Sequence, residues 1–389
     1  MIGVHRRALR MGAAVLSLSL LATGCGNNAG AKAKGQIEES TTTTTIAKGP
    51  DTAAAQLRTK LAGLLEEHVY LGAAASSARG RPDEQAAAVA ALGGNSDAVS
   101  ANMTAIFSGN DAGVAKQFAP LWKKQSDLVS AQAPGDLAQN ARDIGALLSS
   151  ALPSLSADAV AGPLTAADQA AASGAEPTSL RAAAAQMVTL GSTLAGAIAK
   201  KYPDKISGDP TSKAGDLLTT LDSALREHAF LVCAATDAAI AGRNDDFTSA
   251  KAAIDANSAA VTDAITGAFG ADAGKTFGPL WTKHIGFFYD YAAAVAGKQQ
   301  AAADAAMRNL LAYANDFGAF VNGALPKISK DSAGGLITAH ASIIKDVMDA
   351  QGAKNWTKAY SGERVAADHM SSVASTLVLA IVAQFPKNY

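Results

Sequence analysis

Four histidines in the second half of the sequence lie near the middle of four apolar helical patterns: His228, His284, His340 and His369. On the first pattern, Leu221, Leu225 and Val232 recur with His228 at intervals of three and four residues, which directs the imidazole toward a helical core. A buried imidazole without a hydrogen-bond partner costs about 1 to 3 kcal/mol. One shared metal ion would satisfy all four, so the pattern predicts a four-histidine metal site.

The other three histidines are expected to lie on apolar helix faces in the same way. The residues expected to share a face with His284 are Phe277, Leu280, Phe287 and Tyr291; with His340, Ile337, Ile344 and Val347; and with His369, Val365, Val373, Thr376 and Ala380.

An all-imidazole site favours copper or zinc. A carboxylate-bridged di-iron site is disfavoured, because the residues three and four positions from each histidine are apolar or small. Four protein ligands leave no open position for a substrate, and no His-Glu-x-x-His or serine hydrolase signature occurs, so we predict a binding protein and not an enzyme. Glu227 and Asp368 each precede a histidine in the sequence. Each could accept a hydrogen bond from a metal-bound imidazole on a neighbouring helix. We expect acidification through about pH 6 to release the metal.

Two other interpretations remain open at this stage. A single histidine on an apolar face is usually a hydrogen-bonded core residue, so the protein could be a structural or protein-interaction lipoprotein with core histidines or a pH-sensitive cluster. A haem held non-covalently between two histidines is the other, with Phe287, Phe288 and Met348 against the porphyrin. Covalent c-type haem is excluded because Cys-x-x-Cys-His is absent.

The sequence contains two copies of one helical unit, whose landmarks follow one another in the same order. His68 and His228 lie in similar segments, and each is followed by Pro-Leu-Trp, at 120–122 and at 279–281. Ala-Leu-Pro comes next, at 151–153 and 324–326, and then an Arg-to-Met segment, at 181–187 and 364–370. The intervals between these later landmarks are wider in the second copy. The first copy is therefore the shorter one between its Trp122 and its last helix.

The first copy lacks three of the four histidines. At the positions that match His228, His284, His340 and His369 it has His68, Gln125, Ala167 and Gln186. Independent structural histidines would have no reason to disappear together while the surrounding motifs remain. Their joint absence favours one shared site that only the second copy keeps.

The composition predicts an all-α fold, because alanine-rich segments are separated by Gly, Pro and Asn at helical intervals. We expect two antiparallel helical bundles, at 53–208 and 209–389. The helices expected in the second are 213–241, 246–268, 273–296, 299–323, 331–352 and 356–384.

The N-terminus predicts export. Residues 1–24 combine a basic start with a short apolar run, and Ala-Thr-Gly-Cys resembles a bacterial lipobox that would imply cleavage before Cys25 and a lipid such as palmitate on it. Residues 25–52 read as a flexible tether. The expected location is therefore extracytoplasmic, with a lipid anchor in the bacterial cell membrane; the alternative is an ordinary secretory peptide with an incidental cysteine.

The charge pattern argues against nucleic acid as a partner. The formal net charge is -1, and basic residues are interspersed with acidic ones, so no basic stripe is available to follow phosphates. Membrane lipid and a metal ion are the partners that the sequence predicts, and it identifies no protein partner.

The pattern "EH", "LW..HI.FF.DY", "DAQ" and "QFP" resembles a helical-repeat region of uncharacterised secreted bacterial proteins, some of which are associated with copper-amine-oxidase N-terminal-like domains. The resemblance covers residues 55–387 and is best in the second copy. It implies a helical, exported, metal-linked protein. It implies no oxidase activity, since nothing in this sequence resembles the oxidase's quinone-forming tyrosine motif.

Overall fold

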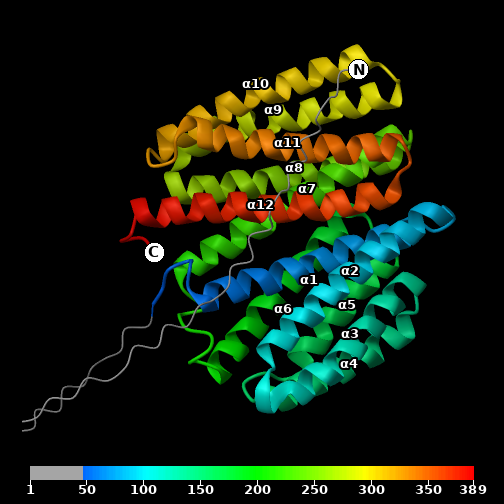
Figure 1. Ribbon diagram of the computed structural model, residues 1–389, viewed down its shortest axis with the longest axis vertical. Helices are drawn as coiled ribbons and strands as arrows, with labels where there is room; N and C mark the ends of the chain where they lie inside the picture. Colours follow the sequence, from blue (N-terminus) through cyan, green and yellow to red (C-terminus); the bar gives the residue numbers. More distant parts are fainter. Residues whose placement is uncertain (1–46) are drawn as a thin grey trace, which may run out of the picture. The chain divides into compact units, whose positions relative to one another are not determined.

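The computed structural model describes residues 47–389, which form twelve α-helices and one short 3₁₀ turn with no strand among the described residues, confirming the all-α prediction (Figure 1). The helices are α1 Ala53–Ser77, α2 Pro82–Ile106, α3 Ala112–Ala131, α4 Pro134–Ala151, α5 Ala157–Ala172, α6 Pro177–Lys201, α7 Lys213–Ile240, α8 Asn244–Phe269, α9 Ala271–Ala296, α10 Gln300–Ala324, α11 Lys330–Gly352 and α12 Trp356–Gln384. The signal peptide, Cys25 and most of the expected tether lie outside the described residues.

The helix boundaries follow from local capping chemistry. Thr52, Ser156, Ser212 and Ser329 each accept a hydrogen bond from the backbone N–H three residues later, which satisfies a donor that the first helical turn leaves free. Three helices of the first copy instead begin with proline, whose fixed φ suits the first helical position. The six helices expected in the second copy are present, with ends within three residues of the predicted ones.

The shortening of the first copy is located in its three middle helices. Helices α3, α4 and α5 have 20, 18 and 16 residues, whereas their counterparts α9, α10 and α11 have 26, 25 and 23. Each is therefore about two turns shorter, and no helix has been lost.

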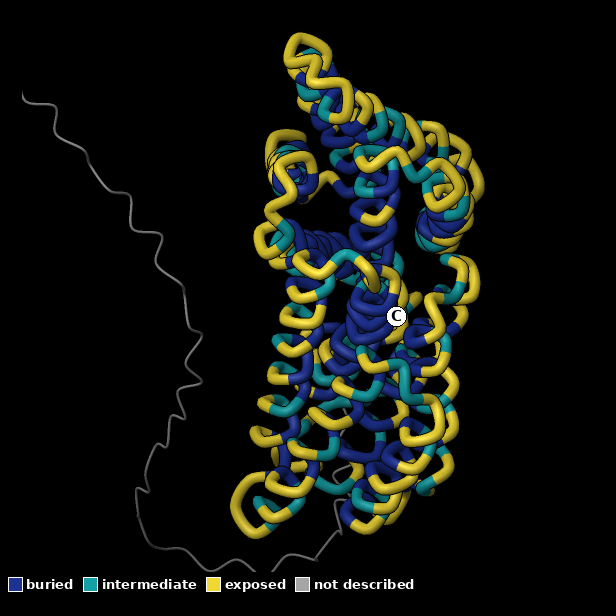
Figure 2. The backbone as a smooth tube through the Cα atoms, turned by 90° about the vertical axis from the view of Figure 1, so that its right-hand side faces the viewer, coloured by how far each residue is buried: buried dark blue, intermediate teal, exposed yellow. Residues whose placement is uncertain are grey.

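Helices α1 and α7 are the central helices of residues 46–389, which form one compact unit. Every residue from Leu61 to Ala73 is buried, as is every residue from Leu225 to Cys233. In Figure 2 the buried turns lie inside and the exposed turns on the outer helices. A helix buried on all sides must find partners inside the protein for each polar side chain it carries.

The two central helices run parallel to each other around a local two-fold axis. The hydroxyls of Thr59 and Thr219, which occupy equivalent positions, are 3.0 Å apart. Further along, the equivalent rings of Tyr70 and Phe230 stack with their centroids 5.3 Å apart. Equivalent residues meet at both places, about 16 Å apart along the helix, so α1 and α7 are in register.

Buried ion pairs repeat across this axis. Glu67 of α1 accepts hydrogen bonds from Arg226 at 2.6 Å and from Arg364 of α12. At the position related by the two-fold axis, Glu227 of α7 pairs with Arg181 of α6 at 3.1 Å. These pairs connect the central helices to the last helix of the opposite copy.

Helices α6 and α12 are long and apolar enough to cross a membrane, judged by length and composition alone. Helix α6 packs along α1, and α12 packs along α7 and α11. The apolar faces of both helices are thus used in packing within the compact unit.

We predict that Glu67→Ala lowers the free energy of unfolding by about 3 kcal/mol, because Arg226 is only 3% exposed and would lose its buried carboxylate. Urea denaturation is the measurement. Asp127→Ala is the control, since its pair with Lys123 is exposed and should contribute little. Equal, small losses in both variants would contradict this account of the interface.

Candidate metal centre

Three of the four predicted histidines meet in the core of the second copy. His228 of α7, His284 of α9 and His340 of α11 each offer a ring nitrogen, and these three nitrogens all lie within 4.8 Å of one another. The Nε2 atoms of His228 and His284 are 3.3 Å apart. All three side chains are buried, with 0 to 1% of their surface exposed.

The helix that carries His284 presents a face slightly different from the predicted one. Trp281 and Phe288 are buried beside His284, whereas the predicted Leu280 and Phe287 are only partly buried. The prediction placed the apolar stripe one residue away from its true position, because both choices satisfy intervals of three and four. His284 lies on both stripes and therefore faces the core in either case.

His369 is placed outside the group, and the predicted face of its helix was wrong. Of the predicted face, Val365 is 54% exposed and Thr376 is exposed, and only Val373 is buried; Met370, which was not on the predicted face, lies on the buried side of α12. The Nε2 of His369 bonds to the carbonyl of Leu336 at 2.9 Å. Its ring stacks parallel to that of His340 with centroids 6.4 Å apart, so it borders the group as a neighbour.

Glu227 and Asp368 have partners other than the histidines. Glu227 accepts hydrogen bonds from Tyr70 and Asn257, both at 2.7 Å, on the side of α7 that faces α1 and α8. Asp368 accepts one from Arg226 at 2.9 Å. They hold the helices together and do not orient the imidazoles.

Burial keeps the three imidazoles neutral. Desolvation, together with the neighbouring histidines, lowers the pKa of His228 and of His340 well below the usual value. Burial also lowers the pKa of His284 to about 4, although its bond to the carbonyl of Trp281 acts in the opposite direction. Neutral imidazole is the form that binds metals.

The ring nitrogens have few partners besides one another. Nδ1 of His284 lies against the carbonyl of Trp281, which leaves its Nε2 as an electron-pair donor. Within residues 47–389, Nδ1 of His228 and both nitrogens of His340 have no hydrogen-bond partner. Buried polar atoms without partners are uncommon and call for an explanation such as a missing ion.

The spacing suits a metal ion without rearrangement of the closest pair. Two nitrogens that each lie 2.0 to 2.1 Å from a tetrahedral ion are about 3.3 Å apart. The Nε2 atoms of His228 and His284 have this separation. A ring nitrogen of His340 completes the group of three within 4.8 Å.

The equivalent position of the first copy shows how the same core is filled by hydrogen bonds. Gln125, which replaces His284, donates to Asp168 at 2.7 Å and accepts from Asn140 at 2.7 Å. Nε2 of His68 lies 3.1 Å from the other oxygen of Asp168. His68 also packs on Trp122 as His228 packs on Trp281, with ring centroids 5.0 and 4.8 Å apart. The scaffold is therefore the same, and only the polar contents differ.

Sequence reasoning missed three members of these sites, Asn140, Asp168 and Tyr313. Tyr313 stacks on His284 with centroids 4.9 Å apart, and it matches Asn140 by the same shift that relates the two Ala-Leu-Pro motifs. Asp168 corresponds to Ala341 by that shift. The signal was therefore visible in the repeated motif, and applying the shift to every polar residue of the first copy would have found all three.

Comparison with protein-family models, curated proteins and solved structures gave no significant match to this chain. The resemblance to secreted helical-repeat proteins stays a prediction. What the group can do is therefore argued from its own geometry: three neutral, buried, closely spaced nitrogen donors could hold a metal ion.

We predict that the metal-free protein becomes less stable as pH falls from about 6.5 to about 4. The pKa of His284 is lower in the folded than in the unfolded chain, so in this window the unfolded chain binds more protons. A single group shifted this far accounts for up to about 3 kcal/mol. The low pKa values also move the expected acid release of metal from pH 6 to more acidic conditions.

The measurement is urea denaturation in the presence of a chelator at several pH values, for wild type and His284→Phe. Phenylalanine keeps the stacking on Tyr313 and removes one titrating group. It also removes the effect of His284 on the pKa of His228 and of His340, which acts in the same direction, while contributions from groups that do not interact with His284 cancel in the difference. The variant should lose less stability between pH 6.5 and 4. Parallel curves would show that His284 is not held neutral by the fold.

Proposed function

We propose that this protein binds copper through His228, His284 and His340, as a binding or transfer protein of the cell envelope. The observation that carries the proposal is the convergence of three buried ring nitrogens within 4.8 Å, in a core where three further nitrogen atoms of the group lack partners or face only a backbone carbonyl. The group sits in one copy of the repeat, while the other copy fills the same space with hydrogen bonds.

The charge of the surroundings favours the monovalent state of the metal. The side chains packed around the group include Trp281, Phe288 and Tyr313, and the carboxylates that precede histidines in the sequence, Glu227 and Asp368, are engaged elsewhere. The cost of burying an ion rises steeply with its charge in a medium of low polarity. Three neutral imidazoles with no counter-charge therefore suit Cu(I) better than Cu(II) or Zn(II).

Binding is supported more strongly than catalysis. A three-histidine site leaves one coordination position, as catalytic zinc sites do. Here the neighbouring side chains are mostly aromatic rings, and no carboxylate in the described part of the chain contacts the imidazoles. An ion held in this way could be stored or passed on but would have no activated water beside a general base.

The packing of the group argues against haem. The ring of His228 lies 5.2 Å from that of His284 and 5.7 Å from that of His340, measured between centroids. The neighbouring apolar cavity lined by Trp281 and Met370 has a volume of only about 30 Å³. A porphyrin would have to separate the helices to enter.

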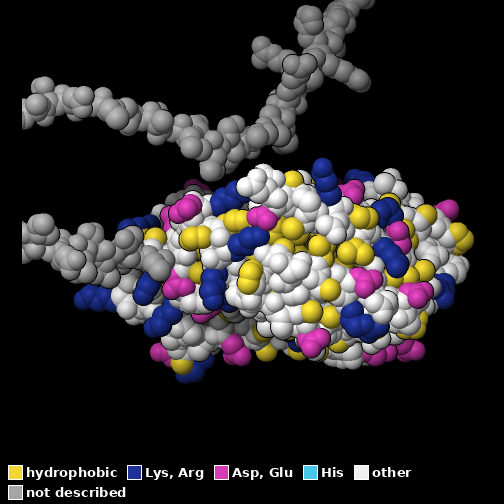
Figure 3. Space-filling view, turned by 90° about the horizontal axis from the view of Figure 1, so that it is seen from below, with side chains coloured by type: hydrophobic (Ala, Val, Ile, Leu, Met, Phe, Trp, Pro, Cys, Tyr) yellow, Lys and Arg dark blue, Asp and Glu magenta, His cyan; other side chains and the backbone are white. Residues whose placement is uncertain are grey.

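The proposed location is the outer side of the bacterial cell membrane, with lipid on Cys25. This part of the proposal comes from the basic and apolar pattern of residues 1–24. The surface agrees with a role that does not involve nucleic acid: on the face in Figure 3, basic and acidic side chains are interspersed.

We expect the full-length protein to take up about one equivalent of Cu(I) per chain under reducing conditions, measured by elemental analysis after dialysis. His68→Gln, at the matching position of the first copy, is the control and should leave the stoichiometry unchanged. A chain that takes up no copper, or loses it equally in the His68 variant, would refute the proposal. Preferential uptake of Zn(II) would correct the identity of the metal.

The decisive variant rebuilds the first copy's network in the second. His284→Gln alone would leave an amide without partners, since Ala341 and Tyr313 stand where Asp168 and Asn140 are. Combining His284→Gln, Tyr313→Asn, His340→Ala and Ala341→Asp should give a folded protein that binds no copper. Its melting temperature should not respond to copper, whereas that of the wild type should rise.

His369→Gln separates a three-histidine site from a four-histidine site. Because Nε2 of His369 bonds to the carbonyl of Leu336, we expect copper stoichiometry to be kept and affinity to change less than tenfold. His340→Gln is the matched variant on the neighbouring helix and should abolish stoichiometric uptake. Loss of copper from both variants to the same extent would restore His369 as a ligand.

A further inference from the structure

A second candidate site lies where the two copies meet, about two helical turns along α7 from His228. A cavity of about 310 Å³ is lined by residues of α1, α2, α6, α7, α8, α11 and α12. Aromatic side chains form part of its wall: Tyr70, Phe230, Trp356 and Tyr360. It is large enough for a small organic molecule.

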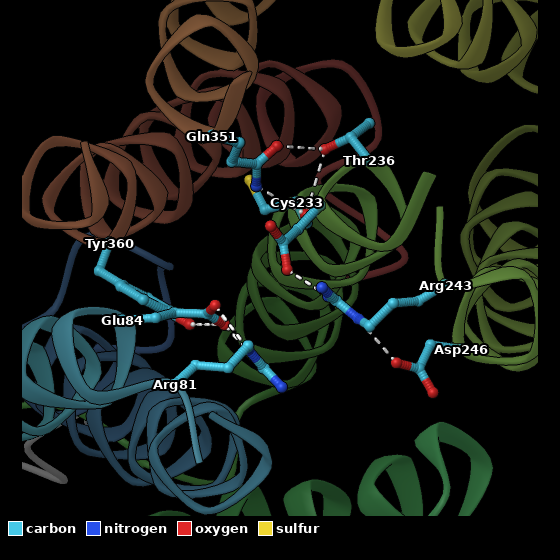
Figure 4. A network of polar contacts seen from close by, with 9 residues as sticks. Arg81, Glu84, Cys233, Thr236, Arg243, Asp246, Gln351 and Tyr360 are labelled. Carbon is cyan, nitrogen blue, oxygen red and sulfur yellow. Dashed lines mark hydrogen bonds and ion pairs between the residues drawn. The ribbon is translucent and has the colours of Figure 1, made fainter. Parts of the chain in front are cut away.

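Five carboxylates line this cavity: Glu84, Glu176, Asp237, Asp246 and Glu363. Glu176 and Asp246 are exposed, and of the other three, Glu84 and Asp237 are paired. Glu84 accepts two hydrogen bonds from Arg81, at 2.7 and 2.8 Å, and lies 3.4 Å from the hydroxyl of Tyr360 (Figure 4). Asp237 pairs with Arg243 through one oxygen, while its other oxygen has no partner among the described residues. The acids and arginines therefore come from both copies.

Glu363 of α12 is the third of the less exposed carboxylates, and it has no partner. Its surface is only 8% exposed, it lines the cavity, and the described part of the chain gives it neither a hydrogen bond nor an ion pair. A buried carboxyl group without a partner is costly in either charge state. A ligand in this cavity could supply the partner that the Glu363 carboxyl group lacks.

The repeat shows which groups are additions of the second copy. Arg81 and Glu84 correspond to Arg243 and Asp246, so an arginine paired to the acid three residues later is common to both copies. In contrast, three cavity residues of the second copy have counterparts of another kind: Asp237 matches Ser77, Tyr360 matches Pro177, and Glu363 matches Leu180. Leu180 also lines the cavity, opposite in character to Glu363.

We propose that this cavity binds a small organic cation, an ammonium or guanidinium group attached to an apolar body, with Glu363 and the free oxygen of Asp237 as its anionic partners. Aromatic walls attract such cations through their ring faces and pack on the apolar body. Each of the two carboxylates has an oxygen free to accept a hydrogen bond from the N–H donors of an ammonium or guanidinium group.

A metal ion fits this cavity less well. Within residues 47–389, the histidine group is where three potential ligand atoms lie within 4.8 Å of one another, and the carboxylates of this cavity do not approach that closely. Acids and aromatic rings around a cavity of about 310 Å³ suit a ligand larger than a single ion.

Binding of a cation has a second expected signature. Burial, with the charges of Asp237 and Glu84, raises the pKa of Glu363 well above its usual value, which favours the neutral acid in the empty cavity. An ammonium ion beside it would favour the carboxylate. The proton would then pass to the buffer when the cation binds.

The test uses the full-length protein and three probes of similar size: phenylethylammonium, phenylethanol and phenylpropionate. Calorimetry in two buffers with different ionisation enthalpies gives affinity and proton release together. We expect the cation to bind at least tenfold more tightly than the neutral and anionic probes and to release a proton. Equal affinities for the three probes, or no binding of any, would overturn the proposal.

Two variants locate the effect. Glu363→Gln keeps the shape, and Glu363→Leu reproduces the residue of the first copy; both should weaken cation binding at least tenfold without lowering the melting temperature. Glu66→Gln is the control, a buried acid that contacts Ser223 outside the cavity. Cation binding that survives in both Glu363 variants would also overturn the proposal, and the charge selectivity of the wild type decides the matter if a variant fails to fold.

Discussion

Two parallel helices without access to water impose the main constraint on this protein. Each polar side chain on the buried stretches of α1 and α7 must find a partner inside the fold. The ion pairs of Glu67 and Glu227 meet this demand with arginines of the opposite copy. His68 meets it with Asp168, whereas His228 meets only other histidines. The candidate metal centre is thus a place on the central helices where buried ring nitrogens are left without a partner from the described residues.

The sequence was sufficient for the helices and for the repeat, because these depend on local capping and on short motifs. Residues such as Ser212 and Ser329 mark helix starts through contacts with the next helical turn. It was also sufficient for His228, His284 and His340, since a residue at the centre of an apolar stripe stays buried when the stripe is misplaced by one position. These three conclusions need no knowledge of how the helices are arranged.

His369 shows where such reasoning fails. Alanine-rich helices contain several overlapping sets of small and apolar residues, and on α12 the set through Val365 was as regular as the set through Met370. Only the packing of α12 on α7 and α11 decides between them. The partners of Glu227 and the cavity at Glu363 depend in the same way on contacts between helices far apart in the sequence, which no local pattern encodes.

The register of α1 with α7 has an evolutionary consequence. Meetings of equivalent residues, such as Thr59 with Thr219, are what an isologous homodimer displays along its symmetry axis. In a homodimer, any substitution appears twice, and every site exists in duplicate. Duplication and fusion of an ancestral half would remove that restriction. Each half could then change by itself, and the two halves now differ: one has shorter middle helices and a hydrogen-bonded interior, and the other has the buried histidine group on the same symmetric framework.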